Sequence, residues 1–313
     1  MKLQAVKKLA MFTVTTVVCV ASQSVWAHTG VRDSAIEGVS GYNAFTITHG
    51  CNGNVTLGAH RNVIAQSVVF PNSPNAADTV IYRLDPVTGV STGVTQADLS
   101  ADIYASAPTT DVPEGTLLAP GEGIYSQLGI GLITAGGTLF PNIIPSVDAT
   151  LNIRGYRTWS GPYPHKGAAV EESVVSTTAL SPWRYGKGVV FIPTSCAKSL
   201  KVRIAIANWC RKGLTSVGLD DRVDLWIGHT TDLFNDQRTM PRAKAYNYAT
   251  EVPFWPTFTI KRDLIAKPLD NSCGAGYDLA IEPSSADIDK YLTMPAGKYP
   301  NGIPGGTSQI YYP

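Results

Sequence analysis

The residue best suited to chemistry in this sequence is His28, which follows a stretch typical of an export signal. Three lysines precede a largely apolar run too short to span a bilayer, and Val25 and Ala27 are the small residues that signal peptidase favours before its cut. Cleavage after Ala27 makes residues 1–27 a signal peptide and leaves His28 with a free α-amino group beside its imidazole. Those two nitrogens form a chelate ring on a copper ion, so the sequence predicts His28 as a metal ligand. The alternatives are a cut elsewhere, or a terminal histidine in a tail without function.

A second imidazole, His49, lies just past the alternating segment 43–48. A hairpin between the leading segment and this expected strand brings His28 and His49 to one end of a sheet. Two imidazoles and an α-amine form a three-nitrogen set suited to Cu(II). His60 is close enough in sequence to supply a third side chain. The alternatives are a hydrogen-bonded loop residue for His49 and a solvated turn residue for His60.

The other two histidines have no second histidine or cysteine at ligand spacing. For both His165 and His229 we expect surface or hydrogen-bonding roles. The sequence also lacks the Gly-x-Ser-x-Gly, His-Glu-x-x-His and P-loop motifs of hydrolytic and nucleotide-binding enzymes. We therefore expect a binding protein rather than an enzyme.

Short alternating segments between turns must position these histidines, because 29 glycines and 21 prolines punctuate the chain and no long segment has a helical period. In the segment 201–206, aliphatic residues alternate with Lys201 and Arg203, which predicts a strand with a basic outer face. The further candidate strands are 43–48, 189–192, 223–227 and 257–260.

This pattern predicts an all-β fold, an antiparallel immunoglobulin-like β-sandwich with long loop insertions over residues 28–313. Turn signals around weak strands in residues 71–150 indicate either a long insertion or a sub-domain boundary. The tail after Pro283 is rich in proline, glycine and tyrosine, and we expect it to pack as an extended strand or arm.

Cleavage removes Cys19 and leaves four cysteines, an even number that favours two disulfides in an oxidising compartment. Three pairings are open to them. We favour the pairing of Cys51 with Cys196 and of Cys210 with Cys273, although the spacing alone does not decide between the three.

The charge balance argues against nucleic acid as a partner. The mature chain has 22 basic and 24 acidic residues with no basic block. It also has no second apolar run of membrane-spanning length, so we expect no transmembrane segment after cleavage and a periplasmic, secreted or cell-surface location.

The segments Ala27–Thr29 and Gly41–Cys51, the second containing Thr-His-Gly-Cys, resemble the YcnI-like copper-binding proteins (domain of unknown function 1775). The resemblance covers about residues 27–56. It implies an immunoglobulin-like β-sandwich whose copper is held by the terminal residue His28 and by His49, which falls at or next to the family's second-ligand position. This chain is longer than the family pattern and has no acidic residue where some members use a glutamate.

Residues and resemblance together predict an exported copper-binding protein for storage, delivery or sensing, with copper held by His28, His49 and His60. Its partners are then the copper ion and another copper-handling protein. Two alternatives remain open: a structural or surface-associated β-protein without a metal, and an oxidative copper enzyme with a similar terminal histidine.

Overall fold

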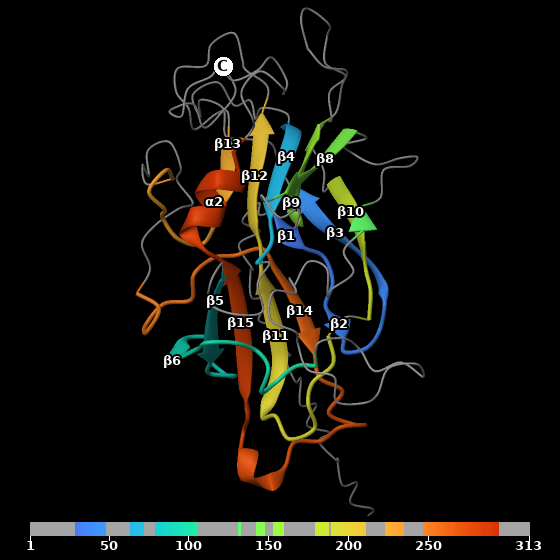
Figure 1. The fold of residues 1–313 in the computed structure, drawn as a ribbon, viewed down its shortest axis with the longest axis vertical. Helices are drawn as coiled ribbons and strands as arrows, with labels where there is room; N and C mark the ends of the chain where they lie inside the picture. Colours follow the sequence, from blue (N-terminus) through green and yellow to red (C-terminus); the bar gives the residue numbers. More distant parts are fainter. Residues whose placement is uncertain are drawn as a thin grey trace, which may run out of the picture.

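The computed structural model of the chain (Figure 1) describes residues 29–47, 63–71, 79–104, 131–132, 142–147, 153–159, 179–187, 189–210, 223–234 and 247–293. Within them, fifteen β-strands form three sheets beside one α-helix, which confirms the prediction of an all-β fold. The six-stranded sheet occupies the lower half of the view in Figure 1 and the five-stranded sheet the upper half. None of the described helices is long and apolar enough to cross a membrane.

The four-stranded sheet contains the first predicted strand. Phe45 and Ile47 are both fully buried on one face of β3, as the alternation in 43–48 predicts. All pairings in this sheet are antiparallel. Its order is β1 (Gly30–Val31), β3 (Gly41–Ile47), β10 (Ala179–Tyr185) and β7 (Gly131–Leu132).

The six-stranded sheet departs from the expected purely antiparallel arrangement, because β2 pairs in parallel with β14 and β11 in parallel with β15. The connection from β14 to β15 passes the start of β11, so the two strands flank β11 and run in opposite directions. The strand order is β2 (Ala35–Ile36), β14 (Thr257–Lys261), β11 (Ala197–Arg203), β15 (Tyr277–Pro283), β5 (Thr79–Leu84) and β6 (Ser91–Gln96). The strands β5 and β6 place part of segment 71–150 within this sheet.

The five-stranded sheet is antiparallel throughout. The strand order is β13 (Val223–Trp226), β12 (Ala205–Cys210), β4 (Val63–Val69), β9 (Ile153–Trp159) and β8 (Asn142–Val147). Helix α2 (Ser285–Tyr291) packs Ile288 and Tyr291 against an apolar cluster on one face of this sheet. The Ser284 side chain caps the helix by accepting a hydrogen bond from Asp287 N at 3.2 Å. The expectation of an extended arm is therefore wrong for the first turns after Pro283.

One continuous course of chain links the two larger sheets. Strand β11 continues through Ile204 into β12, and the two strands follow one another along the long axis in Figure 1. Ile204 and its alternating neighbours Val202 and Ile206 are all buried in a core shared by the three sheets, as predicted. Arg203 corrects the expected basic outer face, because it is only 4% exposed. Its ion-pair partner Glu282 lies far along the sequence, where local alternation gives no indication of it.

Two of the remaining strand predictions are confirmed, since β13 and β14 cover the segments 223–227 and 257–260 almost completely. The prediction of a strand at 189–192 is wrong. Val189, Val190 and Phe191 are buried, but within the described residues the segment makes only one β-bridge, from Phe191 to Ile103.

The described disulfide joins Cys196 to Cys273, with Cα atoms 5.3 Å apart. This corrects the expected pairing of Cys51 with Cys196 and of Cys210 with Cys273. Cys196 directly precedes β11 and Cys273 lies in the connection that passes the start of β11, so the fold brings together two residues 77 positions apart. Of the four cysteines after residue 27, Cys51 and Cys210 remain as a possible second pair. Cys51 lies outside the described residues, so the second disulfide stays a prediction.

Candidate functional site

The start of β1 and the end of β3 lie side by side at the same end of the four-stranded sheet. The two strands pair antiparallel, with Gly30 opposite Thr46 and Val31 opposite Phe45. The Thr46 hydroxyl adds two contacts, accepting from Gly30 N at 3.2 Å and donating to Gly30 O at 3.3 Å. The predicted hairpin between the leading segment and this strand is therefore confirmed for residues 30–31.

The other end of β1 is also fixed. The buried Asn43 side chain accepts a hydrogen bond from Asp33 N at 3.1 Å and donates one to Asp33 O at 2.8 Å. Arg32 N donates to Ala44 O at 3.0 Å. Backbone and side-chain hydrogen bonds therefore fix the position at which the chain leaves β1.

Thr29, the first described residue, is buried at one end of a chain of side-chain hydrogen bonds. Asn208 Nδ2 donates to Thr29 Oγ1 at 2.5 Å, and Gln66 Nε2 donates to Asn208 Oδ1 at 2.9 Å. Thr29 is 2% exposed, and Gln66 and Asn208 are fully buried. Asn208 and Gln66 are opposite one another on β12 and β4, so the chain connects the start of β1 to the middle of the five-stranded sheet.

These polar residues occupy a face that is otherwise apolar. Side chains alternate along a strand, so Gln66 lies on the same face as Val68, and Asn208 on the same face as Ile206. Val68 and Ile206 belong to the core that the three sheets share. The inner face of the five-stranded sheet thus carries apolar side chains at Val68 and Ile206, and amide side chains at Gln66 and Asn208, nearer the start of β1.

One atom of this group has no partner among the described residues: Gln66 Oε1 is buried and makes no hydrogen bond. Nearly all buried polar groups in folded proteins are paired, and leaving one unpaired costs roughly 1–3 kcal/mol. Gln66 Oε1 is thus an unsatisfied buried acceptor, on a residue that Asn208 separates from Thr29.

The predicted ligands His28, His49 and His60 lie outside the described residues. In sequence, His28 directly precedes Thr29, and His49 follows Ile47 by two residues. The part of the chain that the structure describes holds no group of three or more His, Cys, Asp or Glu side chains placed to bind a metal. The described structure therefore contributes the positions from which the predicted ligands extend.

A second polar cluster, which sequence reasoning missed, surrounds Glu282 where β11 passes into β12. Arg203 Nη1 lies 2.9 Å from Glu282 Oε2, and the two side chains are 4% and 1% exposed. The Tyr248 hydroxyl donates to Glu282 Oε1 at 3.2 Å, and His229 Nε2 lies 4.0 Å from the same oxygen. The cluster therefore joins β11 and β15 to two loops.

Burial and the Glu282 carboxylate together change the acidity of two tyrosines in this cluster. Burial and, secondarily, Glu282 raise the pKa of Tyr82 to about 12. The same two causes raise the pKa of Tyr248, whose ring stacks on Tyr82 with centroids 5.2 Å apart. Both phenols therefore stay protonated well above neutral pH, and the Tyr248 hydroxyl donates its proton to Glu282.

His229 is the one predicted non-ligand histidine that the described residues include. Its Nδ1 lies 3.0 Å from Thr230 O, and its ring meets the edge of Trp255 at 5.3 Å. The preceding Gly228 has a φ of +66°, and a Cβ there would lie 2.2 Å from the Trp255 ring. A hydrogen-bonding role for His229 is confirmed.

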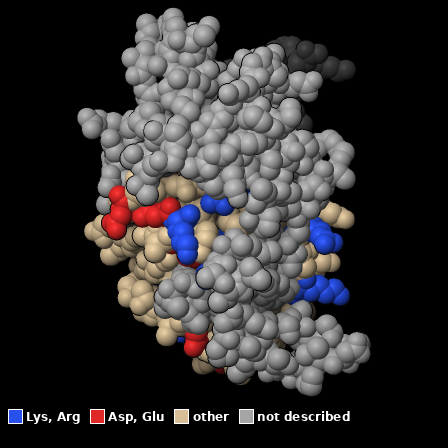
Figure 2. Space-filling model, turned by 45° about the horizontal axis from the view of Figure 1, so that its top comes forward, with Lys and Arg blue, Asp and Glu red and all other residues tan. Residues whose placement is uncertain are grey.

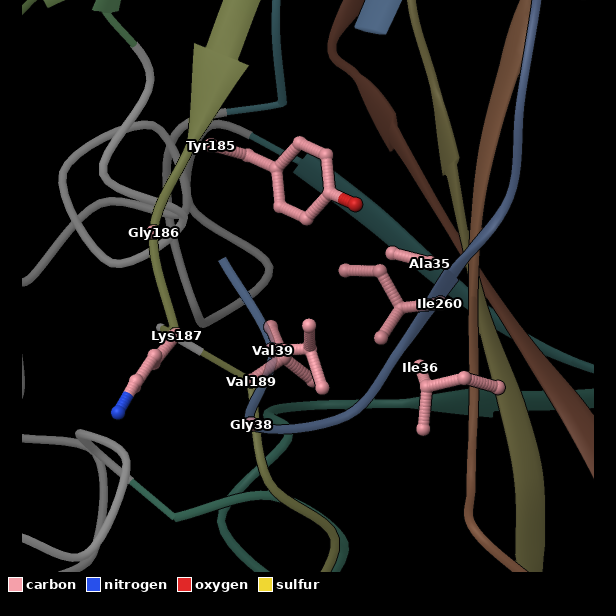
Figure 3. Close-up of a pocket in the computed structure, with 9 residues that line it drawn as sticks. All are labelled: Ala35, Ile36, Gly38, Val39, Tyr185, Gly186, Lys187, Val189 and Ile260. Carbon is pink, nitrogen blue, oxygen red and sulfur yellow. The ribbon is translucent and has the colours of Figure 1, made fainter. Parts of the chain in front are cut away.

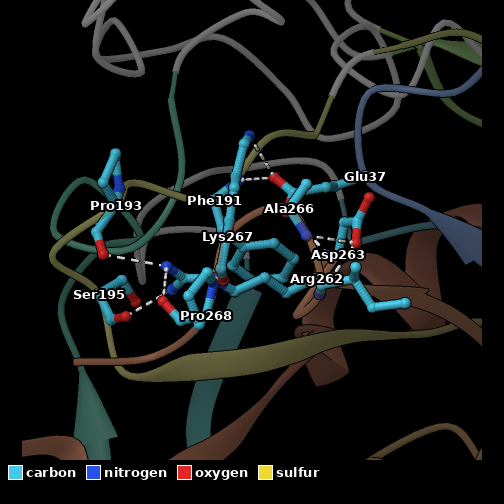
Figure 4. A network of polar contacts seen from close by, with 10 residues as sticks. Glu37, Phe191, Pro193, Ser195, Arg262, Asp263, Ala266, Lys267 and Pro268 are labelled. Carbon is cyan, nitrogen blue, oxygen red and sulfur yellow. Dashed lines mark hydrogen bonds and ion pairs between the residues drawn. The ribbon is translucent and has the colours of Figure 1, made fainter. Parts of the chain in front are cut away.

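A third polar network fixes the connection between β14 and β15 (Figure 4). The buried Glu37 carboxylate accepts from Phe191 N at 2.8 Å, Asp263 N at 3.0 Å and Lys267 Nζ at 3.0 Å. The buried Arg262 guanidinium donates to the backbone oxygens of Ser195 at 2.6 Å and Lys267 at 2.9 Å. These partners come from the chain before β11 and from the connection itself, which indicates a structural role.

Figure 3 shows a small pocket between β2 and the end of β10. Its wall is mainly aliphatic, the Tyr185 ring points across it toward Ala35 and Ile260, and the Lys187 side chain points away. Since its lining includes no histidine, cysteine or carboxylate, we assign no metal or catalytic role to it.

On the left of the face drawn in Figure 2, acidic and basic side chains of the described residues lie next to one another, whereas on its right only basic ones are visible. The chain matches no protein-family model, no curated protein and no solved structure. Functional inference therefore depends on the residues and their geometry.

Proposed function

We propose that this chain is an exported copper-binding protein that stores, delivers or senses copper in the periplasm or outside the cell. Copper is held by the α-amine and imidazole of His28 after removal of residues 1–27, together with His49 and His60. The bound copper is exchangeable, and we assign no catalytic reaction to it. The proposal includes the finer fold assignment, an immunoglobulin-like sandwich with two disulfides.

The observation that carries this proposal is the antiparallel pairing of β1 with β3. This pairing puts the buried Thr29 and Ile47 at the same end of the sheet. In sequence, His28 directly precedes Thr29, and His49 follows Ile47 by two residues. Consecutive Cα atoms are about 3.8 Å apart, so the chain leads to both histidines from this end of the sheet within one or two residues. The resemblance of residues 27–56 to YcnI-like proteins supports the same ligands.

The deciding experiment combines N-terminal sequencing of the exported protein with copper titration. We expect the mature chain to begin at His28 and to bind one Cu(II). The variant His28→Ala, or one extra residue before His28, should weaken binding by more than the roughly 10- to 100-fold that follows loss of an outer-shell partner. His165→Ala is the matched control and should bind as the unchanged protein does. Unchanged copper binding by His28→Ala would contradict the proposal.

Copper affinity should also depend on pH. An α-amine has an ordinary pKa of about 8 and an imidazole of about 6.5, and copper must displace these protons. Below each pKa the proton competes with the metal, so we expect affinity to fall steadily between about pH 8 and pH 5. Competition with a chelator of known proton affinity measures this, and a constant affinity would count against ligation by the amine.

A further inference from the structure

The turn after β14 exposes two large aliphatic side chains, which together form an apolar tip. Ile265 is 98% exposed and Leu264 is 43% exposed. Two more lie beside the turn: Ile36, 44% exposed, pairs in register with Lys261 at the end of β14, and Val39, 51% exposed, lines the same pocket as Ile36. Four of the nine large apolar side chains exposed in the described part of the chain therefore gather around the end of β14. Such grouping marks a binding surface, whereas single exposed apolar residues are ordinary.

Hydrogen bonds hold this turn in one conformation. Asp263 Oδ1 accepts from Ile265 N at 3.1 Å and from Ala266 N at 3.0 Å, and Asp263 O accepts from Lys267 N at 2.7 Å. The buried Glu37, which directly follows β2, accepts from Asp263 N at 3.0 Å and attaches the turn to the sheet (Figure 4). A side chain presented by a fixed turn loses little conformational entropy when a partner buries it.

The charges around the apolar tip are mainly positive. Lys187 and Lys261 are exposed, and neither has an ion-pair partner among the described residues. The Lys187 side chain points away from the neighbouring pocket (Figure 3). Of the nearby carboxylates, Glu37 is paired with Lys267, and Asp263 accepts hydrogen bonds from its own turn. The surface around the tip therefore keeps an excess of positive charge.

We propose that the apolar tip inserts into a lipid surface that contains anionic headgroups, so that the protein docks on a membrane without crossing it. Leu264 and Ile265 enter the boundary between headgroups and acyl chains, while Lys187 and Lys261 contact the anionic headgroups. A second copy of the chain fits less well, because a symmetric dimer places this surface against itself and brings the lysines together. The tip projects from the protein, which suits a fluid surface that closes around it.

Sedimentation of the mature protein with large unilamellar vesicles tests this proposal. We expect binding to vesicles made of equal parts of phosphatidylcholine and phosphatidylglycerol, weaker binding to phosphatidylcholine alone, and weakening by salt. Ile265→Ser should lower the partition coefficient about 10-fold or more, because burial of one aliphatic side chain is lost. Lys261→Gln should lower it about 5-fold on the anionic vesicles and leave binding to phosphatidylcholine unchanged.

The matched control is Val87→Ser in the turn between β5 and β6. Val87 is 90% exposed, and its N–H donates to Asp85 Oδ1 at 3.0 Å, as Ile265 N–H does to Asp263. This variant should bind vesicles as the unchanged protein does. Failure of the unaltered protein to bind anionic vesicles, or equal losses in Val87→Ser and Ile265→Ser, would overturn the proposal. A dimer in analytical ultracentrifugation that Ile265→Ser abolishes, without vesicle binding, would assign the surface to a second copy instead.

Discussion

We expect Glu282→Ala to lower the free energy of unfolding by about 3–5 kcal/mol, because the Arg203 guanidinium would stay buried without its counter-charge. The two groups are 2.9 Å apart, and their side chains are 1% and 4% exposed. The variant also removes the acceptor for the Tyr248 hydroxyl, whose bond to Glu282 is 3.2 Å long. Urea unfolding followed by tryptophan fluorescence measures the loss.

The same two strands contain a matched control. Lys201 Nζ and Asp278 Oδ2 are also 2.9 Å apart, but these side chains are 27% and 12% exposed. Pairs that water reaches contribute about 1 kcal/mol or less, so Asp278→Ala should cost far less than Glu282→Ala. Equal losses in the two variants would show that burial does not decide the strength of these pairs.

A double variant separates the pair from its burial. Replacing both Arg203 and Glu282 by methionine removes the charges while keeping unbranched side chains in the core. Since a buried ion pair gains little over an apolar replacement, the double variant should recover most of the stability that Glu282→Ala loses. A double variant as unstable as Glu282→Ala would point instead to loss of the hydrogen bond from Tyr248.

Local alternation was sufficient to predict strands but not sheets. It found β3 and β14 because each has buried apolar residues at every second position, and it found β13 from the alternation of Val223, Leu225 and Ile227 in the sequence. It assigned Arg203 to an outer face because a charged residue in an alternating strand is usually solvated. The carboxylate that makes its burial possible lies 79 residues later, on a parallel strand. Which strands pair in parallel depends on the path of the long connections between them, and a local sequence pattern does not predict that path.

The candidate site was predictable only in part, for the same reason. The hairpin of the leading segment with 43–48 followed from sequence proximity and alternation. Gln66 and Asn208 were missed, since amides in alternating strands are ordinarily solvated. Here both are fully buried and bonded to one another, although they are 142 residues apart in sequence, and Asn208 also bonds to Thr29. A buried polar pair of this separation becomes visible only when the sheets are packed.

The disulfide between Cys196 and Cys273 should contribute about 4–5 kcal/mol to the free energy of unfolding, by the loop-entropy relation for a separation of 77 residues. The closed loop contains all of β11, β12, β13 and β14, so the bond restricts a large part of the unfolded chain. In the folded state, the contacts of Arg262 with Ser195 O and Lys267 O continue to hold the connection after β14. Replacing both cysteines by serine should therefore destabilise the protein without altering the fold.

Denaturant unfolding of the double serine variant measures this loss, and far-ultraviolet circular dichroism measures retention of the sheets. Ser272→Ala is the control in the same turn. It removes only an exposed hydrogen bond of 2.7 Å to Asp270 and should cost about 1 kcal/mol or less. Peptide mapping of the unreduced protein tests the pairing itself, because a fragment linking Cys210 to Cys273 would contradict it. Since Cys196 precedes β11 and Cys273 precedes β15, the bond joins the two parallel strands at their starts, where no hairpin connects them.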